Sequence, residues 1–177
     1  MEWVRDHLPE VARDIRLNLG TVFNSQNLNE RQVHGTLVAC AFAARNAELL
    51  VAAEEEVQGK LSDEDLALAK SIAATMGMNN VYYRFLHLVE DPEYAQIPAR
   101  LRMQALGAPA DDKLDRELWA LAVSAVNGCG QCIQAHEKTV LQHGASKAMV
   151  HDAVRIASVV NAAAAALDAE PSGANVG

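Results

Sequence analysis

Residues 113–143 read KLDRELWALAVSAVNGCGQCIQAHEKTVLQH and decide the fold class. Apolar residues recur there at helical spacing, without the apolar–polar alternation that is typical of a strand. Gly128 interrupts the pattern and Gly144 follows it, as glycines do at helix ends. We therefore expect two consecutive helices, from Lys113 to Asn127 and from Cys129 to His143.

The rest of the chain has the same helical character. Further helices are expected over Leu8 to Leu19, Glu30 to Arg45, Ala47 to Val57, Ser62 to Met76, Asn79 to Val89, Pro98 to Leu106 and Ser146 to Leu167. Ser62 is an expected N-cap, because acidic residues follow it in the first turn. Pro92 and Pro98 are expected to bracket one loop, and residues 107–112 to form another. No segment has a convincing strand alternation, so the predicted fold is all-α.

The composition is that of one globular domain. The chain has 177 residues, of which 50% are apolar, 21% charged and 5% aromatic, which excludes a disordered chain or a disulfide scaffold. A net charge of −8 repels a phosphate backbone, so nucleic acid is an unexpected partner. We found no uncharged apolar window long enough for a membrane span, and no signal peptide. We expect a single cytoplasmic domain over residues 1–177, without a membrane partner and with a disordered tail over 168–177.

The chain also matches itself at an offset of 84 residues. This offset aligns Leu37 with Leu121, Ser62 with Ser146 and Ile72 with Ile156. The constant register favours an internal duplication, with copies at about residues 30–77 and 113–167. Shared amphipathic periodicity is the alternative explanation, since Ala-rich helices align easily. Only the second copy carries reactive residues: at this offset Arg45, Glu48, Ala52 and Val33 stand opposite Cys129, Cys132, His136 and Glu117.

The densest cluster of reactive side chains lies where the second of the two helices begins. Cys129, Cys132 and His136 are three and four residues apart, so they share one helix face. At the helix N-terminus, free backbone N–H groups and the helix dipole favour a Cys129 thiolate. His136 stands one turn beyond Cys132, close enough to accept its proton directly or through a water. Two thiols at this spacing can also close into a disulfide with little movement.

Three interpretations of the CxxC pair are open. It is a redox dithiol, which its helix position and the nearby histidine favour. It is part of a zinc site, completed by His136 with His143 or His151, although the chain has no second CxxC motif. Or it is two buried cysteines with a packing role. The third cysteine, Cys40, stands alone in an apolar segment and is expected in the core.

Longer stretches of the chain resemble the alkyl hydroperoxidase D (AhpD) family, within the carboxymuconolactone decarboxylase-like superfamily. The similar stretches are Glu117-Leu118-Trp119, residues 122–129 (AVSAVNGC), Cys132, Ala135-His136-Glu137, Leu17-Asn18-Leu19, Gly35-Thr36-Leu37, Arg45-Asn46 and residues 76–81 (MGMNNV). They extend from about residue 9 to about residue 167. The spacing E-x11-C-x2-C-x3-H is more specific than a bare CxxC motif.

The resemblance implies a duplicated helical fold, a homotrimer and a lipoyl-dependent peroxidase without a bound cofactor or metal. By this resemblance, Cys132 is the peroxidatic thiol that becomes a sulfenic acid. Cys129 is the resolving thiol and proton donor, and it closes a redox disulfide with Cys132. His136 and Glu117 form the proton relay.

The resemblance also implies the electron donor and acceptor. Dihydrolipoamide, carried by a 2-oxoacid dehydrogenase component, would reduce the disulfide, and the reduced protein would pass electrons to the peroxiredoxin AhpC. One departure is that Gly130-Gln131 stands between the cysteines, where the family has Ser-His. Two alternatives to the peroxidase are a thiol–disulfide oxidoreductase with little peroxidase activity and a structural or metal-binding helical module.

Overall fold

The computed structural model describes residues 1–107 and 113–169, and every regular element within them is helical. The α-helices are α1 (Glu2–His7), α2 (Arg13–Leu19), α3 (Glu30–Ala43), α4 (Ala47–Glu56), α5 (Asp63–Val89), α6 (Pro92–Gln96), α7 (Lys113–Asn127), α8 (Gly130–Gln142) and α9 (Lys147–Ala169), with short 3₁₀ turns at Glu10–Ala12 and Gln104–Leu106. The all-α prediction is confirmed. The helices expected over 30–45, 47–57, 113–127 and 129–143 are present, with ends within two residues of the prediction.

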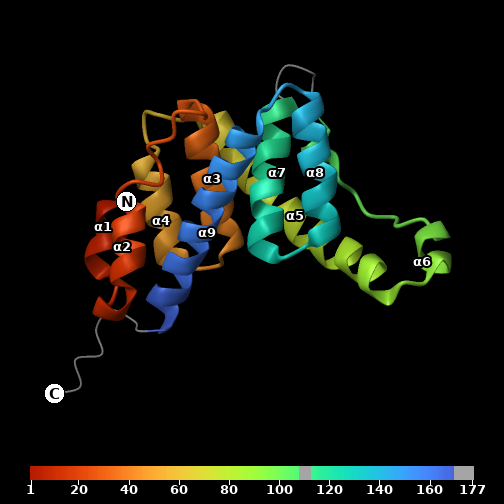
Figure 1. The fold of residues 1–177 in the computed structure, drawn as a ribbon, viewed down its shortest axis with the longest axis horizontal. Helices are drawn as coiled ribbons and strands as arrows, with labels where there is room; N and C mark the ends of the chain where they lie inside the picture. Colours follow the sequence, from red (N-terminus) through yellow and green to blue (C-terminus); the bar gives the residue numbers. More distant parts are fainter. Residues whose placement is uncertain (108–112, 170–177) are drawn as a thin grey trace.

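Helices α3 and α7 form the centre of the fold. In α7, every residue from Leu118 to Ser124 is buried, and α3 is buried almost continuously from Gln32 to Ala41. Helices α5 and α9 contact both of them, α4 packs on α3, and α8 packs on α7 (Figure 1). The C-terminal part of α5 leaves this bundle as an arm that carries α6 away from the other helices (Figure 1). A helix that is apolar on all sides needs neighbours on all sides, and these two central helices have them.

The two central helices approach each other most closely at Gly35 and Trp119. Trp119 is fully buried, and a Cβ atom added to Gly35 would lie 2.1 Å from its Cζ2 atom. Only glycine therefore fits at this position of α3. One turn earlier, the Arg31 guanidinium lies 5.2 Å from the Trp119 ring centroid, at a cation–π distance.

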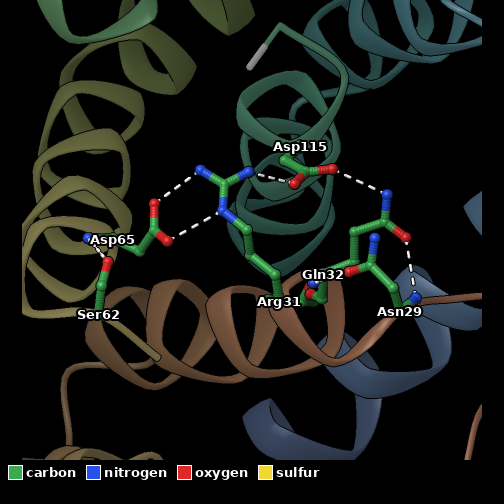
Figure 2. Close-up of polar contacts among 7 residues, drawn as sticks. Asn29, Arg31, Gln32, Ser62, Asp65 and Asp115 are labelled. Carbon is green, nitrogen blue, oxygen red and sulfur yellow. Dashed lines mark hydrogen bonds and ion pairs between the residues drawn. The ribbon is translucent and has the colours of Figure 1, made fainter. Parts of the chain in front are cut away.

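Arg31 also joins three helices through ion pairs (Figure 2). Its Nε and Nη2 atoms donate to Asp65 of α5 at 2.9 and 2.6 Å, and Nη1 donates to Asp115 of α7. Gln32 donates to the same Asp115 carboxylate at 2.8 Å, and its side chain forms a capping box with Asn29. The hydrogen bonds from Arg31 hold the pKa of Asp65 below its ordinary value. The start of α3 is thereby tied to α5 and α7.

The prediction of separate helices over Ser62–Met76 and Asn79–Val89 was wrong. A single helix, α5, runs from Asp63 to Val89 through Gly77. A glycine inside a helix costs only about 1 kcal/mol, and buried residues on both sides of Gly77 pack against the bundle. The expected N-cap is confirmed, since the Ser62 hydroxyl accepts from the backbone N–H of Asp65 at 3.1 Å.

The prediction of one helix over Leu8–Leu19 was also wrong. Residues before 8 form α1, and the helical path resumes only with a 3₁₀ turn and α2. Pro9 explains the break, because the residue before a proline is pushed out of the helical region. Leu8 accordingly has extended dihedrals, with φ −66° and ψ 133°.

The loop expected between Pro92 and Pro98 contains the short helix α6. The Asp91 side chain caps it by accepting from the backbone N–H of Glu93 at 3.0 Å, and Pro92 occupies the first turn. Proline suits that position, because its missing N–H has no helical partner there. Aspartate followed by proline was therefore a helix-start signal in the sequence.

The helix expected over Pro98–Leu106 reduces to the 3₁₀ turn Gln104–Leu106. Ile97, before the proline, is extended at φ −79° and ψ 125°. Arg100 then takes a left-handed conformation at φ +52°, which stops a helix from propagating. Pro98 and the left-handed conformation of Arg100 together keep residues 97–103 non-helical.

The last helix, α9, runs two residues past the predicted end at Leu167. Asp168 and Ala169, expected in a disordered tail, are helical; residues 170–177 of that tail and residues 108–112 of the expected loop lie outside the described residues. Among the described helices, α9 alone is long and apolar enough to suit a membrane span. In this fold it packs on α2, α3 and α7, and its buried Asp152 accepts hydrogen bonds from Ser25 and Asn27.

We predict that Gly35→Ala destabilises the protein by about 3 kcal/mol, because the added methyl group would overlap the Trp119 ring. The matched control is Gly77→Ala. A Cβ atom there meets nothing within 4 Å, so alanine should stabilise α5 by up to about 1 kcal/mol. Urea unfolding of both variants measures the difference. Equal stability of the two variants would show that the α3–α7 contact tolerates a wider spacing.

Candidate active site

The two cysteines lie at the turn between α7 and α8. Gly128 takes a left-handed conformation, with φ +68°, which reverses the chain after α7. The backbone N–H of Cys129 then donates to the carbonyl of Ser124 at 3.1 Å. Cys129 is the N-cap of α8, and its Sγ accepts from the backbone N–H of Cys132 at 3.3 Å. A sulfur thus occupies the place that the side-chain oxygen of a Ser, Thr, Asp or Asn N-cap commonly takes.

Cys129 and Cys132 form a disulfide, with their Cα atoms 5.3 Å apart. Cys129 is completely buried, and Cys132 retains 5% of its surface exposed. Of the two sulfur-bearing residues, only Cys132 therefore has any contact with solvent. The sequence prediction that the pair can close a disulfide at this helix end is consistent with this arrangement.

His136 and Glu117 form a hydrogen-bonded pair across α8 and α7. The Nδ1 atom of His136 lies 2.7 Å from Oε2 of Glu117, and the two side chains are only 13% and 12% exposed. An ionised carboxylate only accepts hydrogen bonds, so a neutral His136 carries its proton on Nδ1. Its Nε2 atom is then the proton acceptor. His136 follows Cys132 by four residues in the same helix, which puts both on one face.

The other oxygen of Glu117 faces a cation. Nζ of Lys113, four residues earlier in α7, lies 4.0 Å from Oε1 of Glu117. Lys113 is 37% exposed, so this ion pair is weakened by solvent. Of these two described partners of the Glu117 carboxylate, His136 is the closer.

Helix α5 braces the turn that carries Cys129. Arg84 Nη1 donates to the carbonyl of Asn127 at 2.7 Å, and the Asn127 amide donates to Asn80 Oδ1 at 3.0 Å. The Asn80 amide donates in turn to the Ser124 hydroxyl at 3.1 Å. Sequence reasoning missed these positioning residues. Residues 79–81 were part of the resemblance but were given no role, and Arg84 had no local signal.

Cys40, His143 and His151 were the other candidate residues from the sequence. Cys40 is completely buried in α3, which confirms its packing role, and burial raises the pKa of its thiol. His143 is the C-cap of α8, with its Nδ1 atom 2.8 Å from the Thr139 carbonyl oxygen. His151 is exposed on α9. In residues 1–107 and 113–169, no three His, Cys, Asp or Glu side chains form a group that could hold a metal ion.

The arrangement suits two-electron thiol chemistry. It brings together two sulfur atoms, the positive end of a helix dipole and a histidine oriented by a carboxylate. The histidine can take a proton from a thiol and return it to a leaving group. Because Cys132 and His136 are so little exposed, only small or slender reactants can reach them.

Comparison with known proteins places this site in a family. The carboxymuconolactone decarboxylase family model matches residues 92–171. The chain is 49% identical over 169 residues to the alkyl hydroperoxide reductase AhpD of Rhodopseudomonas palustris, covering 96% of this chain and 93% of that protein. It is 51% identical over 166 residues to the AhpD of Frankia alni, covering 94% and 90%. The chain belongs to the AhpD family of alkyl hydroperoxide reductases.

Proposed function

We propose that this protein reduces alkyl hydroperoxides with the thiol pair Cys129 and Cys132. The observation that carries the proposal is the disulfide at the N-terminus of α8, beside the His136–Glu117 pair. Relatives named alkyl hydroperoxide reductase that cover nearly the whole chain support the same reaction. The protein is a peroxidase-type oxidoreductase in this proposal, and its two cysteines are the groups that are oxidised and reduced.

Cys132 is the proposed peroxidatic residue, because it is the cysteine with exposed surface and shares a helix face with His136. Its thiolate attacks the terminal peroxide oxygen, the O–O bond breaks, and the alkoxide takes a proton and leaves as an alcohol. The sulfur is thereby oxidised to a sulfenic acid. The Cys129 thiolate then attacks this sulfur, hydroxide leaves as water, and the disulfide forms.

His136 and Glu117 act as the proton relay in this proposal. His136 removes the Cys132 proton through Nε2 and returns it to the departing alkoxide. Glu117 holds the ring through Nδ1 and stabilises the imidazolium that forms in between. The Cys129 thiol loses its proton as it attacks the sulfenic acid, and this proton converts the departing hydroxide to water.

Dihydrolipoamide on a 2-oxoacid dehydrogenase component is the proposed reductant. Its two thiols become a disulfide as Cys129 and Cys132 become thiols, so two electrons are exchanged. The 5% exposure of Cys132 supports a slender dithiol on a flexible arm. Onward reduction of the peroxiredoxin AhpC, and a cytoplasmic location where thiols stay reduced, are proposed from the family resemblance.

A thiol–disulfide oxidoreductase with little peroxidase activity is the second candidate. Gly130-Gln131 between the cysteines favours it, because neither residue can titrate and assist proton transfer. Peroxide consumption measured with and without dihydrolipoamide separates the two candidates.

We also propose that three copies of the chain assemble through the arm. Large exposed apolar side chains gather there: Val81, Phe85, Leu88 and Val89 on α5, Tyr94 on α6, and Ile97 and Leu101 after it. Phe85 and Tyr94 pack edge to face, with 5.3 Å between ring centroids. A patch of this kind marks an interaction surface, and the family resemblance favours a homotrimer.

An internal duplication is the proposed origin of the fold. Helices α7, α8 and α9 begin 83 or 84 residues after α3, α4 and α5, respectively. Ser62 accepts from the backbone N–H of Asp65 at 3.1 Å, and Ser146 accepts from that of Met149 at 3.2 Å. Equivalent N-caps at an offset of 84 support common descent beyond shared periodicity.

We predict that Cys132→Ser abolishes lipoyl-dependent peroxide reduction, because a serine hydroxyl is no peroxide nucleophile near neutral pH. Cys129→Ser should accumulate one sulfenic acid per chain, on Cys132, after one equivalent of peroxide. Cys40→Ala is the control and should retain turnover. Mass spectrometry locates the oxidised residue, and oxidation of Cys129 with retained turnover in Cys132→Ser would reverse the two roles.

Replacing the relay histidine, His136, should lower the turnover rate more than replacing Gln131 between the cysteines. His136→Phe is expected to lower the turnover rate about 10²-fold or more, the usual contribution of a general base. Gln131→His should alter it less than about tenfold. His143→Phe, on the same helix, should leave it unchanged. If His136→Phe keeps most of its activity, the helix N-terminus alone activates Cys132.

Phe85→Glu is expected to convert the trimer to monomers, because it places a charge in the apolar patch of the arm. Val11→Glu provides the control, since Val11 is 86% exposed on the 3₁₀ turn before α2, outside the arm. Sedimentation equilibrium at micromolar concentration measures both variants. A monomeric wild type at that concentration would contradict the assembly.

A further inference from the structure

A polar cavity lies at the C-terminal end of α7, next to the turn that carries Cys129. Its volume is about 330 Å³, and it is lined by the ends of α3 and α7 and by the middles of α5 and α9. The polar lining residues are Arg45, Asn80, Arg84, Asn127 and Asn161, and the others are alanine, glycine and valine. None of the lining residues is acidic, although the chain has a net charge of −8. The cavity is therefore a local cationic site on an acidic protein.

The two arginines have hydrogen-bond donors to spare. Arg84 uses Nη1 to hold the Asn127 carbonyl. Within residues 1–107 and 113–169, no hydrogen bond or ion pair engages its other guanidinium nitrogens or any of those of Arg45. Guanidinium groups present planar sets of N–H donors that match a carboxylate. Two of them at one cavity create a site for an anion.

Arg45 occupies a position that favours glycine. Its φ angle is +64°, close to the +68° of Gly128 at the end of α7. A left-handed conformation costs a residue with a Cβ atom about 1 kcal/mol. An arginine held in this conformation at a cavity rim points to a use for its side chain.

The rest of the lining selects among anions. The C-terminal ends of α3 and α7, at residues 43–45 and 126–127, carry partial negative charge, which opposes a dianion such as phosphate more strongly than a singly charged carboxylate. Small apolar side chains, including Ala43, Ala44 and Val126, offer contact surface to a short hydrocarbon group. The volume is in the range of small-ligand pockets.

We propose that this cavity binds the carboxylate of a small organic acid, between the Arg45 and Arg84 guanidinium groups. The hydrocarbon part of the acid lies against the alanine and valine lining. The site is distinct from the thiol pair, since neither cysteine nor His136 nor Glu117 lines the cavity. Binding requires no redox step and does not depend on the proposed peroxidase activity.

Isothermal titration calorimetry with hexanoate tests the proposal on the oxidised wild-type protein. Hexanoate should bind saturably, while hexan-1-ol and inorganic phosphate should bind at least about tenfold more weakly. Arg45→Gly should weaken hexanoate binding about tenfold or more without lowering Tm, because glycine adopts φ +64° freely. Arg84→Gln should weaken it similarly.

Arg100→Gly is the matched control. Arg100 is also left-handed, with φ +52°, but does not line the cavity, so this variant should bind hexanoate like the wild type. Equal binding of hexan-1-ol, or hexanoate binding unaffected by Arg45→Gly, would overturn the carboxylate site. Phosphate binding as tight as that of hexanoate would overturn the assignment to an organic acid.

Discussion

The contact between Gly35 and Trp119 is the constraint on which the other helices depend. It brings α3 and α7 close enough to exclude water from both, and the remaining helices complete their burial. Arg31 reinforces the contact by lying on the indole ring while its ion pairs reach α5 and α7. Because Glu117 belongs to α7 and the turn before α8 follows that helix directly, this packing also positions the redox site.

Much of the fold could be predicted, because its signals are local. Gly128 and Gly144 mark helix ends, Ser62 marks a start, and the i, i+3 and i+7 spacing of Cys129, Cys132 and His136 depends on one helix alone. The continuity of α5 through residue 77 depends on tertiary packing, which outweighs the cost of a glycine. The short helix α6 was missed because Pro92 was interpreted only as a loop signal.

The site was less predictable where it joins separate helices. The His136–Glu117 bond spans 19 residues and two helices, and spacing alone gave no reason to pair them. The family resemblance supplied that pairing. The bracing by Asn80 and Arg84 crosses more than 40 residues of sequence, and polar residues on an amphipathic helix are usually solvated. Such contacts are decided by how helices pack.

The N-cap position of Cys129 couples electron transfer to the stability of a helix end. In the reduced protein, a thiolate there gains from the free N–H groups and the dipole of α8. Oxidation removes that negative charge, so the same interactions favour the dithiol over the disulfide. The feature that makes the thiol acidic therefore also makes the disulfide a better electron acceptor. Acidity and oxidising power rise together at this one position, and neither can be tuned alone.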